Sequence, residues 1–284
     1  MNAAPKVAAV HDLTGFGRCS LTVALPVLGA MGCQCCPVPT AYLSAHTGFP
    51  ASERASFLDM TGQLPRTAEH WGELGVALDA IYSGFLSSAE QIGLLGEFIG
   101  RFRQAGTLVL VDPVMGDHGR AYRTYTGEMC EKMKSLCDRA DLITPNLTEA
   151  ALLLDEPYCA SPGPDQVRRT LERLSLEGKR SVVITGVSAG EGQVGAACLD
   201  RETGRTCIAM SRREEGQYPG TGDLFASVLL GALLRGGELR SAAECAVEFV
   251  RRAVRRTLEL GTPVLEGVQF EGLLGALVNR EEIT

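Results

Sequence analysis

A glycine-rich turn followed by an acidic residue, Pro219-Gly220-Thr221-Gly222-Asp223, is the strongest chemical signal in the chain. Glycines let the backbone turn with its N–H groups pointing outward, and a helix N-terminus adds partial positive charge, so this turn could hold a phosphoryl group. The carboxylate of Asp223 could accept the proton of an attacking alcohol while those N–H groups stabilise the phosphoryl oxygens. The alternative is a structural turn in which Asp223 is a helix N-cap.

Further polar residues come directly after apolar stretches that we expect to be strands. Asp112 follows a Leu- and Val-rich stretch, and ligands bind at the carboxyl ends of strands in open parallel sheets. Thr144 ends the next apolar stretch. Asn146 with Glu149 also has the pattern of a helix start. Thr185 ends another stretch, although the glycine after it is equally typical of a plain turn.

The elements that must position these residues alternate between strand and helix. Short apolar runs predict strands, and apolar residues at helical spacing predict the helices between them. Such alternation implies an α/β fold with a mainly parallel sheet covered by helices. The expected strands are 6–10, 35–38, 77–82, 107–111, 142–144 and 181–185, with a hairpin over 194–210. The expected helices are 20–31, 88–104, 128–137, 149–154, 164–177, 224–234, 242–260 and 270–277, and residues 40–50 form a loop near the ligand.

Length and composition indicate one globular domain over residues 1–284, with 45% hydrophobic and 21% charged residues. The net charge is −7 and there is no long basic run, so nucleic acid is not an expected partner. Arg251, Arg252, Arg255 and Arg256 fall at helical spacing and predict a solvated helix face. Without a signal region or a long apolar stretch, we expect a cytoplasmic protein that does not bind membranes.

Ten cysteines in a chain of this length are expected to remain thiols. Cys33 and Cys36 form a C-x-x-C pattern, with Cys35 between them. No second Cys or His pair lies at the spacing of a structural zinc site. Buried thiols in a strand are therefore the preferred interpretation.

Taken together, the motifs resemble the ribokinase-like superfamily and, within it, the pyridoxal/pyridoxamine kinase branch. The resemblance covers almost the whole chain, and its motifs occur in family order at similar intervals. It implies a single domain with a central, mainly parallel sheet flanked by helices. The stretches that carry it, besides the Gly220 to Asp223 turn, are Gly15-Phe16-Gly17-Arg18-Cys19-Ser20, Ser44-Ala45-His46-Thr47-Gly48, Asp112-Pro113-Val114-Met115-Gly116-Asp117 and Thr144-Pro145-Asn146-Leu147-Thr148-Glu149.

The resemblance implies an in-line transfer of the ATP γ-phosphate to a primary alcohol, with Asp223 as general base. Its cofactors would be ATP and Mg²⁺, with a monovalent cation as a further candidate, and it implies a homodimer. The anion hole would be formed by Gly220, Thr221 and Gly222. The ATP-binding residues would be Asp112, Thr144, Asn146, Glu149 and Thr185. The carboxylates near Mg²⁺ would be Asp112, Asp117 and Glu149, which are hard oxygen ligands of the kind this ion requires.

For the acceptor, the resemblance implies the 5'-hydroxymethyl group of pyridoxal, pyridoxamine or pyridoxine, with His46 and Thr47 near the ring. The chain departs from many relatives at two ring positions. Val10, followed by His11 and Asp12, stands where many have a serine, and Phe85 stands where many have a tyrosine. Each departure removes a hydroxyl, although Asp12 could accept a hydrogen bond from a ring substituent.

Other functions remain open at this point. A hydroxymethylpyrimidine kinase or another small-alcohol kinase would share these motifs, so only the ring pocket and turnover would separate them. A dinucleotide-dependent oxidoreductase is suggested by the glycines near residue 15, but the acidic residue that would hold the ribose is missing between Asp12 and Glu53. A non-catalytic ligand-binding protein is disfavoured because Asp223 and its turn are retained.

Overall fold

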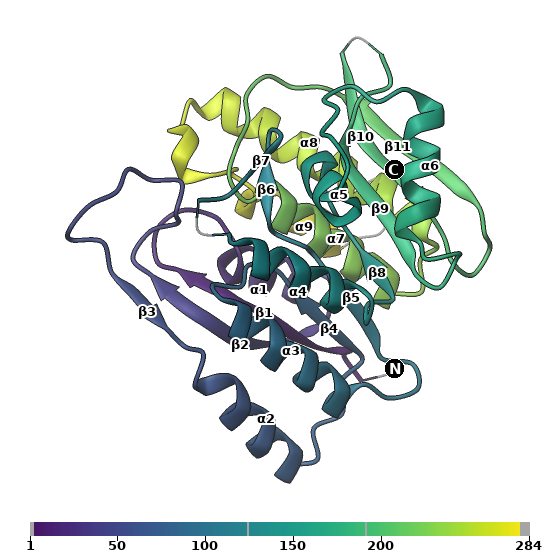
Figure 1. The fold of residues 1–284 in the computed structure, drawn as a ribbon. Coiled ribbons are helices and arrows are strands. Elements are labelled where there is room, and N and C mark those ends of the chain that lie inside the picture. The colour runs from purple at the N-terminus through teal and green to yellow at the C-terminus, as the bar shows by residue number, and fades with distance from the viewer. Residues whose placement is uncertain (1–2, 124, 191, 279–284) are drawn as a thin grey trace.

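A twisted sheet runs through the middle of the molecule and carries helices on both faces (Figure 1). The computed structural model describes residues 3–123, 125–190 and 192–278, and within them the sheet has nine strands in the order β11-β10-β9-β8-β5-β4-β1-β2-β3. The strands are β1 (Lys6–Thr14), β2 (Gln34–Leu43), β3 (Phe57–Asp59), β4 (Ala80–Ser83), β5 (Leu108–Val111), β8 (Leu142–Ile143), β9 (Ser181–Val187), β10 (Gln193–Leu199) and β11 (Thr206–Arg212).

The central strands from β2 to β9 pair in parallel, whereas β3, β10 and β11 are antiparallel additions at the two edges. Strands β4 and β5 are almost entirely buried, which agrees with the continuous Leu and Val content of β5. A separate small hairpin joins β6 (Gly116–Asp117) to β7 (Arg120–Ala121). The expected α/β class with a mainly parallel sheet is confirmed.

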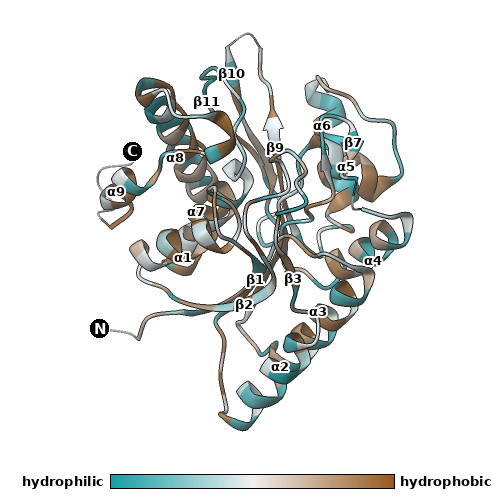
Figure 2. Cartoon of the chain, turned by 90° about the vertical axis from the view of Figure 1, so that its left-hand side faces the viewer, coloured by the Kyte–Doolittle hydropathy of each residue, from teal (hydrophilic) through white to brown (hydrophobic). Residues whose placement is uncertain are grey.

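Two hydrophobic cores lie on opposite faces of the sheet, as the two groups of helices in Figure 2 show. One face is covered by α2 (Gln63–Glu73), α3 (Ala89–Phe102), α4 (Gly127–Cys137), α5 (Leu147–Leu154) and α6 (Pro164–Leu174). The other is covered by α1 (Leu21–Ala30), α7 (Thr221–Leu234), α8 (Leu239–Leu260) and α9 (Leu274–Val278), with the short 3-10 helices η1 (Val264–Glu266) and η2 (Glu271–Leu273) between α8 and α9.

Several boundaries differ from the sequence-based expectation. Strand β1 continues past Val10 to Thr14, because His11, Asp12 and Thr14 are polar but buried. Strand β2 likewise reaches Leu43, so the first part of the expected loop 40–50 is strand. Helix α2 and the β6–β7 hairpin were not predicted. The expected hairpin over 194–210 is confirmed as β10 and β11.

The arginines and cysteines only partly follow expectation. Arg255 and Arg256 are exposed, but Arg251 is half-buried and forms ion pairs with Glu214 at 2.9 Å and Glu248 at 2.6 Å, which corrects the expected solvated face.

Cys33 is buried, whereas Cys35 and Cys36 are only half-buried. All ten cysteines are free thiols, and within the described residues no cluster of His, Cys, Asp and Glu could hold a metal ion by itself. Over the same residues, no helix combines the length and apolarity needed to cross a membrane.

Candidate active site

A cavity of about 990 Å³ opens at the carboxyl ends of the parallel strands. This is the edge of the sheet at which open α/β folds bind ligands. The predicted site residues reach it from distant parts of the chain, and Val10 alone among them does not. Those that line the cavity are Asp12, His46, Thr47, Phe85, Asp112, Asp117, Thr144, Asn146, Glu149, Thr185, Gly220, Thr221, Gly222 and Asp223.

The glycine turn forms the start of helix α7. Gly220 is the N-cap residue and has a left-handed backbone, with φ of 78°. A Cβ atom at this position would lie 1.9 Å from the carbonyl oxygen of Arg18, so both the conformation and the space require glycine. The first N–H groups of α7 therefore face the cavity from a backbone packed against the β1–α1 loop, which is a suitable anion site.

Asp223 lies in the first turn of α7, so it is not the N-cap that the alternative interpretation required. Its Oδ2 accepts a hydrogen bond from the backbone N–H of Ser20 at 2.9 Å, and its Oδ1 lies 3.8 Å from Nδ1 of His11. Burial and the negative charge of Asp12 raise the pKa of Asp223 to about 7, against the opposing effect of the Ser20 hydrogen bond. Burial lowers the pKa of His11 to about 3, so its imidazole is neutral beside this carboxyl group. Asp223 is thus poised to exchange a proton near neutral pH.

Ser20, which donates its backbone N–H to Asp223, has an unusual backbone conformation. Its backbone has φ 54° and ψ −127°, a conformation that costs a non-glycine residue of the order of 1–3 kcal/mol. The Ser20 hydroxyl donates to Oδ1 of Asp12 at 2.5 Å, and the Thr14 hydroxyl donates to Oδ2 of the same residue at 2.8 Å. Asp12, which we expected to contact the ring, therefore fixes the residue that orients Asp223.

A second buried carboxyl group, Asp112, lies at the end of β5. It accepts a hydrogen bond from the Thr144 hydroxyl at 3.1 Å, and a Cβ atom at Gly222 would be 3.9 Å from its Oδ2. Burial and the charge of Asp223 raise the pKa of Asp112 to about 8. Two buried acidic groups, one of which disfavours the ionisation of the other, are suited to receive a cation or a cation-bound phosphate.

Asn146 and Glu149 form a capping box at the start of α5. The Asn146 side chain accepts from the N–H groups of Thr148 and Glu149, and Glu149 accepts from the N–H of Asn146 at 2.9 Å. The other Glu149 oxygen accepts from the N–H of Met115 at 3.1 Å, and Asn146 donates to the Gly116 carbonyl at 2.8 Å. The pair thus joins α5 to the turn that carries Asp117. Burial, together with the charge of Asp112, raises the pKa of Glu149 well above its usual range.

The 44–50 loop, where we expect the ring to bind, lines one part of the cavity with His46, Thr47 and Gly48. His46 is buried, with Nδ1 accepting from the Gly48 N–H at 3.1 Å and Nε2 2.6 Å from the Leu265 carbonyl oxygen. This pattern assigns the proton to Nε2 and uses both ring nitrogens within the protein. The expectation that Val10 borders the ring is wrong, because its side chain is fully buried in the core next to α2 and α3.

Sequence reasoning missed several residues that line the same cavity. Val264 and Leu265 of η1 follow the last long helix and belong to no motif, so no sequence signal marked them. Arg212 is the last residue of β11 and Arg213 follows it, and both bring positive charge to the cavity. Two adjacent arginines after an expected strand could have indicated this placement. Arg251 was interpreted as a surface residue because it shares helical spacing with exposed arginines.

Comparisons with known proteins find relatives over most of the chain. Residues 71–266 match the family model described as phosphomethylpyrimidine kinase. The chain is 31% identical over 255 residues to a pyridoxine/pyridoxal/pyridoxamine kinase of Bordetella avium, covering 88% of this chain and 85% of the relative. It is 41% identical to a Bacteroides thetaiotaomicron protein, provisionally assigned as a phosphomethylpyrimidine kinase and crystallised with pyridoxal, with a TM-score of 0.91 and 96% of both chains covered. For a pyridoxal kinase from Lactobacillus plantarum, the identity is 32% and the TM-score 0.88, with 96% of both chains covered.

Proposed function

The chain belongs to the pyridoxal kinase family within the ribokinase-like superfamily, and we propose from this that it transfers the γ-phosphate of ATP to the 5'-hydroxymethyl group of a vitamin B6 vitamer. The observation that carries the proposal is the placement of Asp223. Asp223 follows a glycine turn at the N-terminus of a helix and lines a cavity large enough for both a nucleotide and a small ring. The similar protein crystallised with pyridoxal, at 41% identity, supports the same class of acceptor.

In the proposed mechanism, Asp223 takes the proton of the acceptor hydroxyl as that oxygen attacks the γ-phosphorus. Oδ2 is held by the Ser20 N–H, so Oδ1 is the oxygen free to receive the proton. The N–H groups at Gly220, Thr221 and Gly222 stabilise the charge on the phosphoryl oxygens, and ADP leaves in line. A base with a pKa of about 7 is well matched to a reaction near neutral pH.

Mg²⁺ fits the same site. The described residues hold no complete cage of protein ligands, but Mg²⁺ commonly binds through one or two carboxylates, substrate phosphates and water. Asp112 and Asp117 would hold it, both lining the cavity. Glu149 would act mainly by fixing the Asp117 turn, because both of its oxygens already accept backbone N–H groups. The ion would neutralise charge on the triphosphate.

A hydroxymethylpyrimidine acceptor is the second candidate, because the matching family model carries that description. The test is ATP-dependent phosphorylation of pyridoxal, pyridoxamine, pyridoxine and hydroxymethylpyrimidine by the purified protein. Turnover of one or more B6 vitamers with a higher kcat/KM than the pyrimidine supports the proposal. Selective turnover of the pyrimidine overturns the substrate and keeps the kinase.

We also propose that the chain acts as a homodimer. The outer strand β3 leaves Phe57 and Leu58 53% and 59% exposed, and Tyr42 of the neighbouring β2 is 38% exposed. Large apolar side chains on an open sheet edge are typical of surfaces that another chain covers. Sedimentation of the wild type as a dimer would support this assembly, and a monomer at micromolar concentration would contradict it.

A further inference from the structure

The segment that follows α8, residues 262–271, contributes Val264 and Leu265 to the cavity lining. It begins after Gly261, which ends α8 in a left-handed conformation, and it includes η1. Val268 and Phe270 anchor it, because both side chains are fully buried in the core beside α7 and α8. Between the anchors and α8, Val264 and Leu265 line the cavity. We call residues 262–271 the strap.

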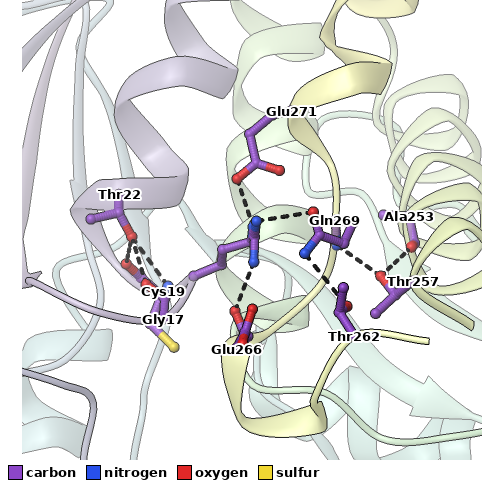
Figure 3. Close-up of polar contacts among 10 residues, drawn as sticks. Gly17, Cys19, Thr22, Ala253, Thr257, Thr262, Glu266, Gln269 and Glu271 are labelled. Carbon is purple, nitrogen blue, oxygen red and sulfur yellow. Dashed lines mark hydrogen bonds and ion pairs between the residues drawn. The ribbon is translucent and has the colours of Figure 1, made fainter. Parts of the chain in front are cut away.

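Arg18 ties the strap to the β1–α1 loop through several hydrogen bonds. Figure 3 shows Glu266, Gln269 and Glu271 of the strap near Gly17 and Cys19 of that loop. Its guanidinium donates to Glu271 at 2.6 Å, to the Gln269 side chain at 3.0 Å and to the Glu266 carbonyl at 3.1 Å. Its own backbone N–H also donates to the Glu266 carbonyl at 3.2 Å. The Arg18 carbonyl oxygen is the atom that packs against Gly220, so the strap and the anion turn are positioned by the same residue.

A second hydrogen bond to the strap comes from the 44–50 loop. Nε2 of His46 donates to the Leu265 carbonyl at 2.6 Å, and Gly48 occupies the other ring nitrogen. His46 therefore has no ring nitrogen left for a ligand, and its ring N–H holds the backbone of Leu265. The strap is also tied to α8, since the Gln269 N–H donates to the Thr257 hydroxyl at 2.7 Å.

We propose that Leu265 is a specificity-determining residue of the acceptor site, and that His46 and Arg18 are positioning residues that hold it there. This rests on the proposed kinase function and deepens it. Leu265, together with Leu43 and Phe85, gives the ring end apolar walls, while Asp12 and Thr47 supply polar groups. Apolar walls with a few fixed polar groups suit a flat heteroaromatic ring that carries polar substituents, as B6 vitamers do.

The test is steady-state kinetics of Leu265→Ala with pyridoxal, pyridoxine and ATP varied in turn. Removing part of an apolar wall weakens binding of ground state and transition state alike, so KM for the vitamer should rise by about 10-fold or more, with kcat and KM for ATP nearly unchanged. Leu265→Met, which keeps the volume, should stay within about 2-fold of wild type. Leu260→Ala is the matched control, because Leu260 is 54% exposed at the end of α8 and lies outside the cavity lining.

A double-mutant cycle with His46→Phe tests how His46 acts. If His46 works by holding Leu265, the effects on vitamer KM of His46→Phe and Leu265→Ala will be clearly less than additive. Additive effects would overturn the positioning role of His46. A wild-type KM for the vitamer in Leu265→Ala would overturn the role of Leu265 while leaving the kinase proposal standing. An inactive wild type would instead contradict the proposed function itself.

Discussion

Replacing Gly220 with alanine should disable phosphoryl transfer while leaving the protein folded. The left-handed backbone at φ 78° costs an alanine about 1–2 kcal/mol. The new Cβ would also sit 1.9 Å from the Arg18 carbonyl oxygen, a contact that must be relieved by a backbone shift of about 1 Å. Because a misplacement of that size in a catalytic site can reduce the rate by about 100-fold, we expect kcat for a B6 vitamer to fall by at least that factor.

Gly32→Ala separates the cost of the left-handed backbone from the effect of the contact between Cβ and Arg18. Gly32 has nearly the same φ, 79°, but a Cβ atom there would meet nothing within 4 Å. It should lower the free energy of unfolding by about 1–2 kcal/mol and leave kcat unchanged. Both variants would be measured by ATP-dependent phosphorylation of pyridoxal and by urea unfolding. Wild-type kcat in Gly220→Ala would refute the claim that the turn's close packing against Arg18 places the anion site.

Three further predictions concern the same cavity. Asp223 must be ionised to act as the base, so kcat/KM should rise with pH through about 7. Asp12→Asn removes a like charge and lowers the pKa of Asp223, so a pH profile of this variant should show the rise at lower pH. Asn146→Ala removes the N-cap of α5 and should lower the free energy of unfolding by about 1–2 kcal/mol in urea titrations; a loss below about 0.3 kcal/mol would contradict the capping role. EDTA should abolish turnover and added Mg²⁺ should restore it; full activity in EDTA would exclude the metal.

The sequence was sufficient to predict the position of a site residue where the local pattern of apolar residues or glycines is followed directly by a reactive side chain. The Leu- and Val-rich run before Asp112 predicts a buried strand, and the glycines before Asp223 predict a turn whose function depends on backbone geometry. Both predictions place a residue at the carboxyl edge of the sheet, and the structure brings them into one cavity.

What the sequence could not supply depends on contacts between distant segments. His11 and Asp12 look like the end of a strand because they are polar, and only the fold shows that they are buried beside Asp223. Val10 was expected in the ring site, but the alternation of side chains along β1 turns it into the core. No sequence motif marks the strap, because it is held in place by Arg18, which lies about 250 residues earlier in the chain.

The central claim is that Asp223 is the base of a B6 vitamer kinase. The most direct test compares Asp223→Asn with the wild type in ATP-dependent phosphorylation of pyridoxal, with nucleotide affinity measured in parallel by calorimetry. The account predicts that kcat falls by about 100-fold or more, the contribution typical of a positioned general base, while the Kd for ATP changes little. A variant that turns over pyridoxal at nearly the wild-type rate would contradict it.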